Sequence, residues 1–386
     1  MADLYTQLLF PVFKRFDPET AHERTLAALT LAQATPAGRL ALQRIAGRLP
    51  ALPVQIGPLR FPNPLGMAAG FDKDARVVAG LAALGFGHVE VGTLTPRPQA
   101  GNPRPRIFRL PADAALINRM GFPNGGVVAA VPRLRALSAR PRDYVLGVSL
   151  GKQKETPLEN AADDYVAVMR AVYELADYLA VNISSPNTPG LRALQGGRHL
   201  ESLLAALMAE SRALAARTGS LPKPLWVKIA PDLSGEELDE VLAALTAAGV
   251  AGVIATNTTL ARDGLRDPRA TETGGLSGRP LRARSTELIA AIHHRTGGAL
   301  PIIGVGGIAS ADDALEFLLV GATAIQVGTA NFLRPDFAFG LAREHDNNAI
   351  ALPDGVQIGE RAVHPEDRLV DRVARLHGRR RFTRCA

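Results

Sequence analysis

The segment NISSPNTPGLRALQ, residues 182–195, concentrates side chains that could take part in a reaction. It places Ser184 and Ser185 between the amides of Asn182 and Asn187. An amide both donates and accepts hydrogen bonds, which suits a ligand ring that bears N–H and C=O groups. A serine hydroxyl is a weak base unless its surroundings assist it, and the segment contains no histidine. Other parts of the chain must therefore supply the rest of such a site.

Two lysines, Lys73 and Lys228, and two further asparagines, Asn118 and Asn257, lie in or beside short apolar runs. A lysine at the end of a strand is often simply solvated, and a lone asparagine is more often a turn residue than a ligand. Lys228 differs because it lies within the run PLWVKIA, where an unpaired ammonium is costly. A fixed cation of this kind suits a flavin, whose ring edge gains negative charge on reduction.

Glycine-rich turns are a third candidate feature. The stretches PIIGVGGI, AIQVGTA and TGGLSGRP contain Gly307, Gly328 with Thr329, and Gly278. Glycine lets backbone N–H groups approach an anion, and the turns after the last two strands of a barrel often bind phosphate. Tight turns favour glycine without any ligand, so one such turn carries little weight. Three together favour a phosphorylated cofactor.

Short apolar runs alternate with amphipathic segments from residue 63 onward. The runs are NPLGMAAG, HVEVGT, YVLGVSLG, YLAVNISS, PLWVKIA, GVIATNT, PIIGVGGI and AIQVGTA. They are rich in Val, Ile and Leu, as expected for parallel strands that are covered on both faces. Eight strand–helix units predict an α/β fold, a (β/α)8 TIM barrel over residues 51–335, with a doubly wound sheet as the alternative. We expect apolar strand interiors and functional side chains at the carboxyl ends of the strands.

Residues 1–50 precede the barrel and predict a helical extension. Asp17 followed by Pro18 is typical of a helix N-terminus, and Leu26 and Leu29 begin an apolar stripe. Such a segment could either pack on the barrel or present an apolar surface that meets lipid. The apolar residues at its start are Leu4, Leu8, Leu9, Phe10, Val12, Phe13 and Phe16.

Composition limits the classes of partner. The 386 residues carry a formal net charge of +7, but much of the excess lies in the ending HGRRRFTRCA, so we do not expect nucleic-acid binding. The one cysteine, Cys385, allows no internal disulfide, and we expect no metal site. The sequence has no signal-peptide pattern and no apolar run of roughly 20 residues, which predicts a soluble protein or one that lies on a membrane surface.

Several motifs together resemble the dihydroorotate dehydrogenase family. They are AAGFDKD, VGTLTPRPQAGNPRPRIFRL, INRMGFPN, NISSPNTPGLRALQ, VKIAPDLS, IATNTT, TGGLSGRPL and PIIGVGGI. They occur in the family's order and cover the chain from the N-terminal helices to about residue 335. The extension, with DPETAHERTL, most resembles the quinone-dependent branch. Eight ordered motifs are far more specific than one glycine-rich motif.

The resemblance implies FMN in the barrel mouth and oxidation of dihydroorotate to orotate in pyrimidine synthesis. It also implies a membrane quinone as electron acceptor and peripheral attachment at the cytoplasmic face of the cell membrane. The positions that resemble flavin-binding residues are Ala69, Gly70, Thr93, Asn182, Lys228, Thr256, Gly278 and Gly307, and the glycine turn adds Gly328 and Thr329. Those that resemble the substrate pocket are Lys73, Asn118, Arg119, Met120, Gly121, Phe122, Asn182, Asn187, Asn257 and Thr258.

Ser185 falls on the position of the family's catalytic base, which is a cysteine in the soluble class 1 enzymes. The substrate's C5 proton must leave while a hydride passes from C6 to flavin N5. A serine can serve only if the developing charge acidifies that proton and the proton is relayed onward, while the amides hold the ring in line. Ser184, one residue earlier on a strand, should face the opposite way.

Three features depart from the quinone-dependent pattern. Ser149 in GVSLG stands where the family's third strand usually offers an asparagine to the flavin, and we count it as a cofactor-binding candidate. Gly328 in QVGTANF stands where the quinone branch has a tyrosine, as in class 1. The basic C-terminal tail, residues 336–386, resembles no part of the family. His22 and Arg109 nonetheless resemble positions that meet the quinone head group, where a cation or donor would stabilise its oxygens.

Two other hypotheses compete with the quinone-dependent one. A class 1-like enzyme would pass electrons to a soluble acceptor, which Gly328 favours and Ser185 and the extension oppose. The other hypothesis is a barrel that binds flavin or a pyrimidine but has lost turnover. Ser149 and the unfamiliar tail leave this hypothesis open.

Overall fold

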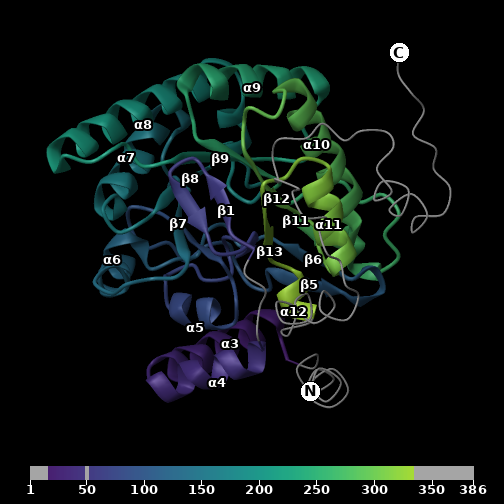
Figure 1. Cartoon of the computed structure of the whole chain (residues 1–386). Helices are drawn as coiled ribbons and strands as arrows, with labels where there is room; N and C mark the ends of the chain where they lie inside the picture. The colour runs from purple at the N-terminus through teal and green to yellow at the C-terminus, as the bar shows by residue number, and fades with distance from the viewer. Residues whose placement is uncertain (1–15, 48–51, 334–386) are drawn as a thin grey trace, which may run out of the picture.

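The computed structural model describes residues 16–47 and 52–333. Its centre is a closed barrel of eight parallel strands surrounded by helices, which confirms the predicted fold (Figure 1). Since β9 pairs with β10 and β13 with β3, the sheet closes on itself, and this excludes a doubly wound sheet. In chain order the barrel strands are β3 (Leu65–Met67), β4 (His88–Leu94), β7 (Val145–Leu150), β8 (Tyr178–Asn182), β9 (Leu225–Ile229), β10 (Gly252–Ala255), β12 (Ile302–Val305) and β13 (Ala324–Val327).

A helix follows each barrel strand. Helix α9 shows why: Ser234 and Glu237 form a capping box at its start, and Gly249 ends it in the left-handed conformation with φ 72°. The helices are α5 (Val78–Ala83), α6 (Gly126–Ser138), α7 (Ala161–Val172), α8 (Gly197–Thr218), α9 (Gly235–Ala248), α10 (Arg282–Arg295), α11 (Ala311–Leu319) and α12 (Ala330–Leu333). Short 3-10 helices in the connections are η2 (Pro111–Asp113), η3 (Leu158–Asn160), η4 (Leu191–Gln195), η5 (Pro268–Thr271) and η6 (Arg279–Leu281).

A two-stranded hairpin and a three-stranded sheet lie outside the barrel, and the sequence did not predict them. Strands β1 (Val54–Ile56) and β2 (Leu59–Phe61) form the hairpin, and its apolar side chains pack in one cluster with inward-facing barrel residues. Strands β5 (Ile107–Leu110), β6 (Ala115–Asn118) and β11 (Gly275–Gly278) form the antiparallel sheet.

The segment TGGLSGRP is therefore not simply the glycine-rich loop that its composition indicated. Part of it is β11, which pairs with β6 along its whole length. Gly278 ends the strand at φ 100°, and a Cβ there would lie 2.5 Å from the carbonyl oxygen of Ala114. Glycine is required at this position by a close approach of two backbones, and the period-2 pattern of a strand is hidden because half of β11 is glycine.

The strand interiors are not uniformly apolar, contrary to our expectation. His88, Glu90 and Gln326 are fully buried in the barrel. One carboxylate oxygen of Glu90 accepts hydrogen bonds from the Tyr178 hydroxyl and the Gln326 amide, both at 3.0 Å. Gly147 makes room for this group, because a Cβ there would lie 2.1 Å from the Tyr178 ring. Strands β4, β8 and β13 are thus joined across the barrel interior by polar contacts.

The described part of the N-terminal extension consists of α3 (Pro18–Gln33) and α4 (Pro36–Ala46). Asp17 caps α3 as predicted, since its side chain accepts a hydrogen bond from the N–H of Thr20. Glu19 forms an ion pair with Arg106 at 2.6 Å, and the two side chains are only 8% and 7% exposed. Removal of one partner of such a buried pair leaves an uncompensated charge, so the pair fixes α3 on the barrel.

In the ranges that the structure describes, no helix is long and apolar enough to cross a bilayer. The apolar residues at the start of the chain lie outside the described residues, as do Cys385 and the tail 336–386.

The buried His88 gives a prediction about stability. Burial lowers its pKa from 6.5 to about 3, and neither ring nitrogen has a hydrogen-bond partner among the described residues. Below pH 6.5 the unfolded chain binds a proton that the folded chain excludes, so stability falls with pH by about 1.4 kcal/mol per unit. In His88→Phe this contribution should vanish between pH 6.5 and pH 4, when unfolding in urea is compared with wild type.

The substituted ring keeps the edge-on packing against Phe61, whose centroid lies 5.0 Å away. The exposed His199 offers a matched control, His199→Phe. Parallel pH slopes for wild type and His88→Phe would show that His88 is not kept neutral by the fold.

Candidate active site

A cavity opens at the carboxyl ends of the barrel strands. Seven of the eight barrel strands, or the turns that follow them, contribute to its wall, and β7 is the exception. Leu116 and Asn118 of β6 and Ser277 of β11 form a further part of the wall, so the three-stranded sheet borders the site. His22 of α3 also lines the cavity, which brings the N-terminal extension into the same space.

Most of the residues predicted from the sequence meet in this cavity. Three do not line it, namely Ser149, Arg119 and Arg109. The candidates that do are Ala69, Gly70, Lys73, Thr93, Asn118, Met120, Gly121, Phe122, Asn182, Ser185, Asn187, Lys228, Thr256, Asn257, Thr258, Gly278, Gly307, Gly328, Thr329 and His22. Positions spread over more than 300 residues of the chain are therefore gathered at one end of the barrel, as the barrel geometry predicts.

Ser149 lies behind the wall rather than in it. Its hydroxyl is 2.9 Å from that of Thr93, and the side-chain amide of Asn182 donates to the same Thr93 hydroxyl at 2.8 Å. Ser149 is too short to reach the cavity past Thr93, so it orients Thr93 and, through it, Asn182. Among the described residues, Ser149 is linked to the cavity wall through Thr93.

Arg119 points away from the cavity although its neighbours line it. Its guanidinium donates to a carboxylate oxygen of Glu272 at 2.7 Å and lies over the ring of Phe108, 4.5 Å from the centroid. These contacts join β6, which precedes Arg119, to the segment before β11 and to β5. The side chain thus supports the sheet that borders the site.

Ser185 is buried, lines the cavity and lies among side-chain amides. Its Oγ accepts a hydrogen bond from the N–H of Asn187 at 3.2 Å. The Asn187 amide donates in turn to Asn118 at 3.1 Å. Ser184 does not line the cavity, and its hydroxyl accepts a hydrogen bond from Asn257 at 3.0 Å. The two serines thus face different ways, and Ser185 is the one that lines the cavity.

The two lysines bring positive charge to the cavity. Burial lowers the pKa of Lys228, and the negative charge of Glu90 opposes this effect. Lys228 has neither a hydrogen bond nor an ion pair with any of the described residues, although its side chain is buried. Burial also lowers the pKa of Lys73, whose ammonium donates to the carbonyl oxygen of Gly70 at 2.8 Å. Both cations are poised to gain from an anionic or strongly polar ligand.

The glycine turn after β12 brings backbone to the cavity wall in a conformation that favours glycine. Gly306 and Gly307 have φ of 128° and 85°, and a Cβ on Gly307 would lie 2.7 Å from the backbone nitrogen of Arg282. Gly328 is different, since a Cβ there would touch only the Ala68 side chain, at 3.8 Å. The first turn requires glycine for its geometry, whereas Gly328 leaves space where a larger side chain could stand.

The far end of the cavity is lined by aromatic rings. His22 packs edge-on against Phe71 at 4.9 Å between centroids and lies 5.2 Å from the Phe332 ring. Burial lowers the pKa of His22 to about 3, and the nearby Lys73 charge acts in the same direction. His22 is therefore neutral at physiological pH, so of the two roles that the resemblance implied, cation or hydrogen-bond donor, it can fill the second. It remains a hydrogen-bonding group in an apolar setting.

Arg109 does not line the cavity, and its contact with a quinone head group stays a prediction. Its guanidinium donates to the carbonyl oxygen of Phe16 at 2.8 Å. Because Phe16 directly precedes the cap of α3, Arg109 ties β5 to the start of the described extension.

Sequence reasoning missed the polar residues Glu90 and Gln326, and the second of these lines the cavity. A signal was present, because each interrupts an apolar run, and a polar residue inside such a run requires a partner. It also missed Thr188, whose hydroxyl is buried without a hydrogen-bond partner among the described residues. Thr188 lies three positions after Ser185, in the same loop.

Comparison with known proteins gives a consistent result. The family model described as dihydroorotate dehydrogenase matches residues 51–344. A Roseiflexus sp. (strain RS-1) protein named dihydroorotate dehydrogenase (quinone) is 51% identical over 349 residues, covering 89% of this chain and 94% of the relative. A Chromobacterium violaceum protein of the same name is 52% identical over 322 residues, covering 83% and 91%.

Among solved structures, DHODH of Eimeria tenella in complex with ferulenol matches with a TM-score of 0.76 at 39% identity, over 86% of this chain and 91% of that one. The closed barrel and the polar cavity at its strand ends define a (β/α)8-barrel enzyme. The chain belongs to the dihydroorotate dehydrogenase family. This family is flavin-dependent in general.

Proposed function

We propose that the chain oxidises dihydroorotate to orotate with FMN as hydride acceptor and a membrane quinone as final acceptor, in pyrimidine biosynthesis. The observation that carries the proposal is the single cavity that unites Ser185, Lys73 and Lys228 with four asparagines. The relatives named as quinone-dependent enzymes, at about half identity over most of the chain, support the same reaction and acceptor.

The donor set of the cavity fits FMN. Lys228 offers a buried ammonium that has no partner in the described chain, which suits the ring edge that becomes negative on reduction. Thr93, Asn182 and Thr256 add hydroxyl and amide groups along the wall. The turn at Gly306 and Gly307 offers backbone N–H groups for the phosphate.

The opposite wall fits dihydroorotate. Lys73 would bind the carboxylate of the substrate, since it lines the cavity and its ammonium has one acceptor among the described residues, the Gly70 carbonyl oxygen. Asn118, Asn187 and Asn257 would hydrogen-bond the ring N–H and C=O groups. The bond between Asn187 and Asn118 fixes the rotamers of both before a ligand arrives, which reduces the entropy lost on binding.

Ser185 is placed to act on the substrate C5 proton. The N–H of Asn187 holds its oxygen, and burial keeps bulk water from competing for the same position. When bound, FMN would supply a hydride acceptor for C6, and the positive charge that develops on the substrate would acidify the proton at C5. A serine hydroxyl that takes up a second proton becomes strongly acidic. Ser185 must therefore pass a proton on to another group. Thr188, with its unpartnered hydroxyl in the same loop, is our candidate for the next carrier.

The N-terminal extension supports a quinone as the acceptor. His22 of α3 lines the same cavity as the proposed flavin site, among the rings of Phe71 and Phe332. The helices α3 and α4 expose apolar side chains on their outer surface, including Leu31 at 77% and Leu40 and Ile45 at 45%. Exposed apolar groups beside an apolar cavity mouth suit a peripheral site on the cytoplasmic face of the membrane.

One observation favours a second candidate, an enzyme that uses a soluble acceptor. Gly328 gives the cavity wall no side chain at the position where the quinone-dependent branch has a tyrosine. The space next to Gly328 is open. Such a gap would loosen the contact with a quinone head group. The comparison of electron acceptors below separates the two candidates.

Our first functional prediction concerns Ser185→Ala. Loss of a general base typically costs about 10²–10⁴ in rate, so reduction of the flavin by dihydroorotate should slow by that factor. Stopped-flow absorbance under anaerobic conditions measures this step, and flavin content should match that of wild type. Ser185→Cys, which restores an ionisable group, should retain more of the rate than Ser185→Ala. Reduction of Ser185→Ala within threefold of wild type would remove Ser185 from the mechanism.

Lys228→Met tests the fit to a flavin through its potential. The substitution removes the charge and keeps the volume of the stem. Since a cation stabilises the reduced ring more than the oxidised one, the midpoint potential should fall by at least about 30 mV, equivalent to about 1.4 kcal/mol for a two-electron couple. An equilibrium dye titration measures it. An unchanged potential at full flavin content would show that Lys228 does not face the ring.

His22→Leu tests the acceptor. The substitution keeps the packing between Phe71 and Phe332 roughly intact and removes the hydrogen-bonding ring. Reoxidation by a long-chain quinone in detergent should slow by about tenfold, because a donor to the quinone oxygens is lost. Reduction by dihydroorotate should stay unchanged. If quinone turnover equals that of wild type while a soluble acceptor such as fumarate is used well, the second candidate is the correct one.

A further inference from the structure

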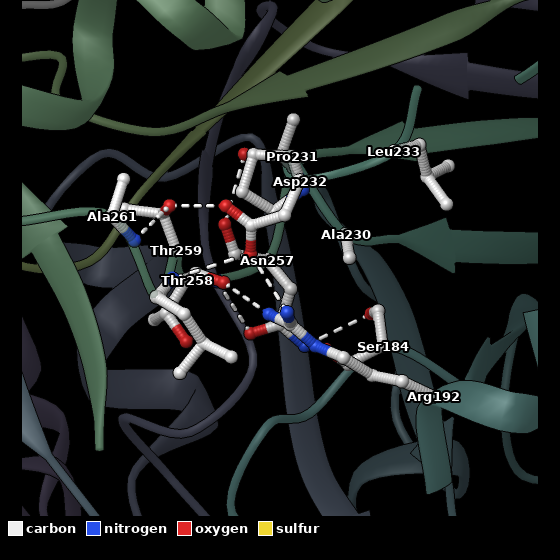
Figure 2. A network of polar contacts seen from close by, with 12 residues as sticks. Ser184, Arg192, Ala230, Pro231, Asp232, Leu233, Asn257, Thr258, Thr259 and Ala261 are labelled. Atoms are coloured by element: carbon white, nitrogen blue, oxygen red, sulfur yellow. Dashed lines mark hydrogen bonds and ion pairs between the residues drawn. The ribbon is translucent and has the colours of Figure 1, made fainter. Parts of the chain in front are cut away.

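Arg192 contacts the ends of three neighbouring barrel strands without lining the cavity. It lies in η4, in the same loop as Ser185 and seven residues further along the chain. Its Nε donates to the carbonyl oxygen of Ser184 at 3.0 Å, and one terminal nitrogen donates to the carbonyl oxygen of Thr258 at 2.8 Å. The other terminal nitrogen donates to a carboxylate oxygen of Asp232 at 2.7 Å (Figure 2). These partners follow β8, β10 and β9 respectively.

The backbone positions that Arg192 holds are next to the residues proposed for the reaction. Ser184 directly precedes the base, Ser185, and Thr258 directly follows Asn257, which belongs to the substrate pocket. A second link joins the same two loops on the inner side, since the Asn257 amide donates to the Ser184 hydroxyl at 3.0 Å. The guanidinium therefore fixes from behind the distance between the base and the opposing amide.

Asp232 extends this arrangement to the loop after β10. One of its carboxylate oxygens accepts from Arg192 and from the N–H of Leu260 at 3.2 Å, and the other accepts from the Thr259 hydroxyl (Figure 2). An exposed ion pair alone would contribute little. Here the side chains of Arg192 and Asp232 are only 22% and 29% exposed, and each makes further hydrogen bonds. A planar guanidinium can serve three acceptors in fixed directions, which an ammonium cannot reproduce.

Arg284 provides an internal comparison. Its guanidinium donates to the carbonyl oxygens of Pro231 and Leu233, both at 2.8 Å, on either side of Asp232. It therefore supports the same loop by the same kind of contact, but within the described part of the chain it makes no hydrogen bond to Ser184 or Thr258. A comparison of the two arginines can therefore distinguish two effects. Loss of Arg284 affects support of the loop alone, whereas loss of Arg192 also affects the placement of Ser185.

We propose that Arg192, assisted by Asp232, is a positioning residue that sets the location of Ser185 relative to the substrate ring. The inference rests on the proposed function, because it assumes that Ser185 removes the substrate proton. A displacement of about 1 Å at a reacting group can reduce a rate by about 10²-fold. Loss of the three-way contact therefore slows the proton-removing half-reaction and leaves cofactor binding and quinone reduction as they are.

The test uses the full-length holoenzyme with Arg192→Ala, Arg192→Lys and the control Arg284→Ala. For both Arg192 variants we expect flavin reduction by dihydroorotate to slow by about 10- to 100-fold. We expect the rate of reoxidation by quinone and the affinity for orotate to remain within about threefold of wild type. The flavin midpoint potential should shift by no more than corresponds to such a factor. Guanidinium ion added to Arg192→Ala should restore part of the rate, and it should not change the rate of Arg284→Ala.

An equal loss in Arg284→Ala, or Arg192→Ala at the wild-type rate, would overturn the proposal, because either result reduces Arg192 to general support of the loop. If Arg192→Ala fails to fold, Arg192→Lys and Asp232→Asn carry the same comparison, and wild-type rates in both would overturn it. Failure of the proposed function is distinguishable, since wild type itself would then not be reduced by dihydroorotate.

Discussion

Lys228 places a positive charge inside the barrel, where water is excluded and a charge without a partner is costly. The fold compensates for this cost from two sides. Inside the barrel, Glu90 supplies a negative charge that opposes the fall in the pKa of Lys228. Tyr178 and Gln326 hold the Glu90 carboxylate in place by hydrogen bonds. At the carboxyl ends of the strands, Lys228 lines the cavity, where a bound ligand could contact its ammonium. A barrel core of this composition makes sense if a ring that gains negative charge binds there.

Once a ring is fixed against Lys228, the remaining groups must lie on its other side at set distances. The barrel meets this requirement because its strands end in one plane and each contributes one or two inward side chains. Hydrogen bonds among Thr93, Asn182, Asn257 and Ser184 orient the amides before a ligand arrives. The Arg192 guanidinium holds the loop that contains Ser185 from outside the cavity, and His22 of α3 adds to the cavity wall.

The sequence predicted the barrel and most of the cavity wall because both depend on local patterns: apolar runs mark strands, and functional residues follow where the runs end. What it did not predict depends on contacts between distant segments. Glu90 meets Gln326 across 236 positions of the chain, and Arg192 meets Thr258 across 66. The neutral state of His22 follows from burial between two rings, and the contact of Arg109 with Phe16 from the docking of the extension. Strand β11 was hidden by its glycines.

The central claim is that the cavity at the strand ends holds a flavin that takes its electrons from dihydroorotate. The most direct measurement is an anaerobic titration of the purified holoenzyme, followed by its visible absorbance. The account predicts that the yellow protein bleaches with about one equivalent of dihydroorotate and that orotate appears in the same amount. A yellow protein that keeps its colour in excess dihydroorotate, yet bleaches with dithionite, would contradict the account.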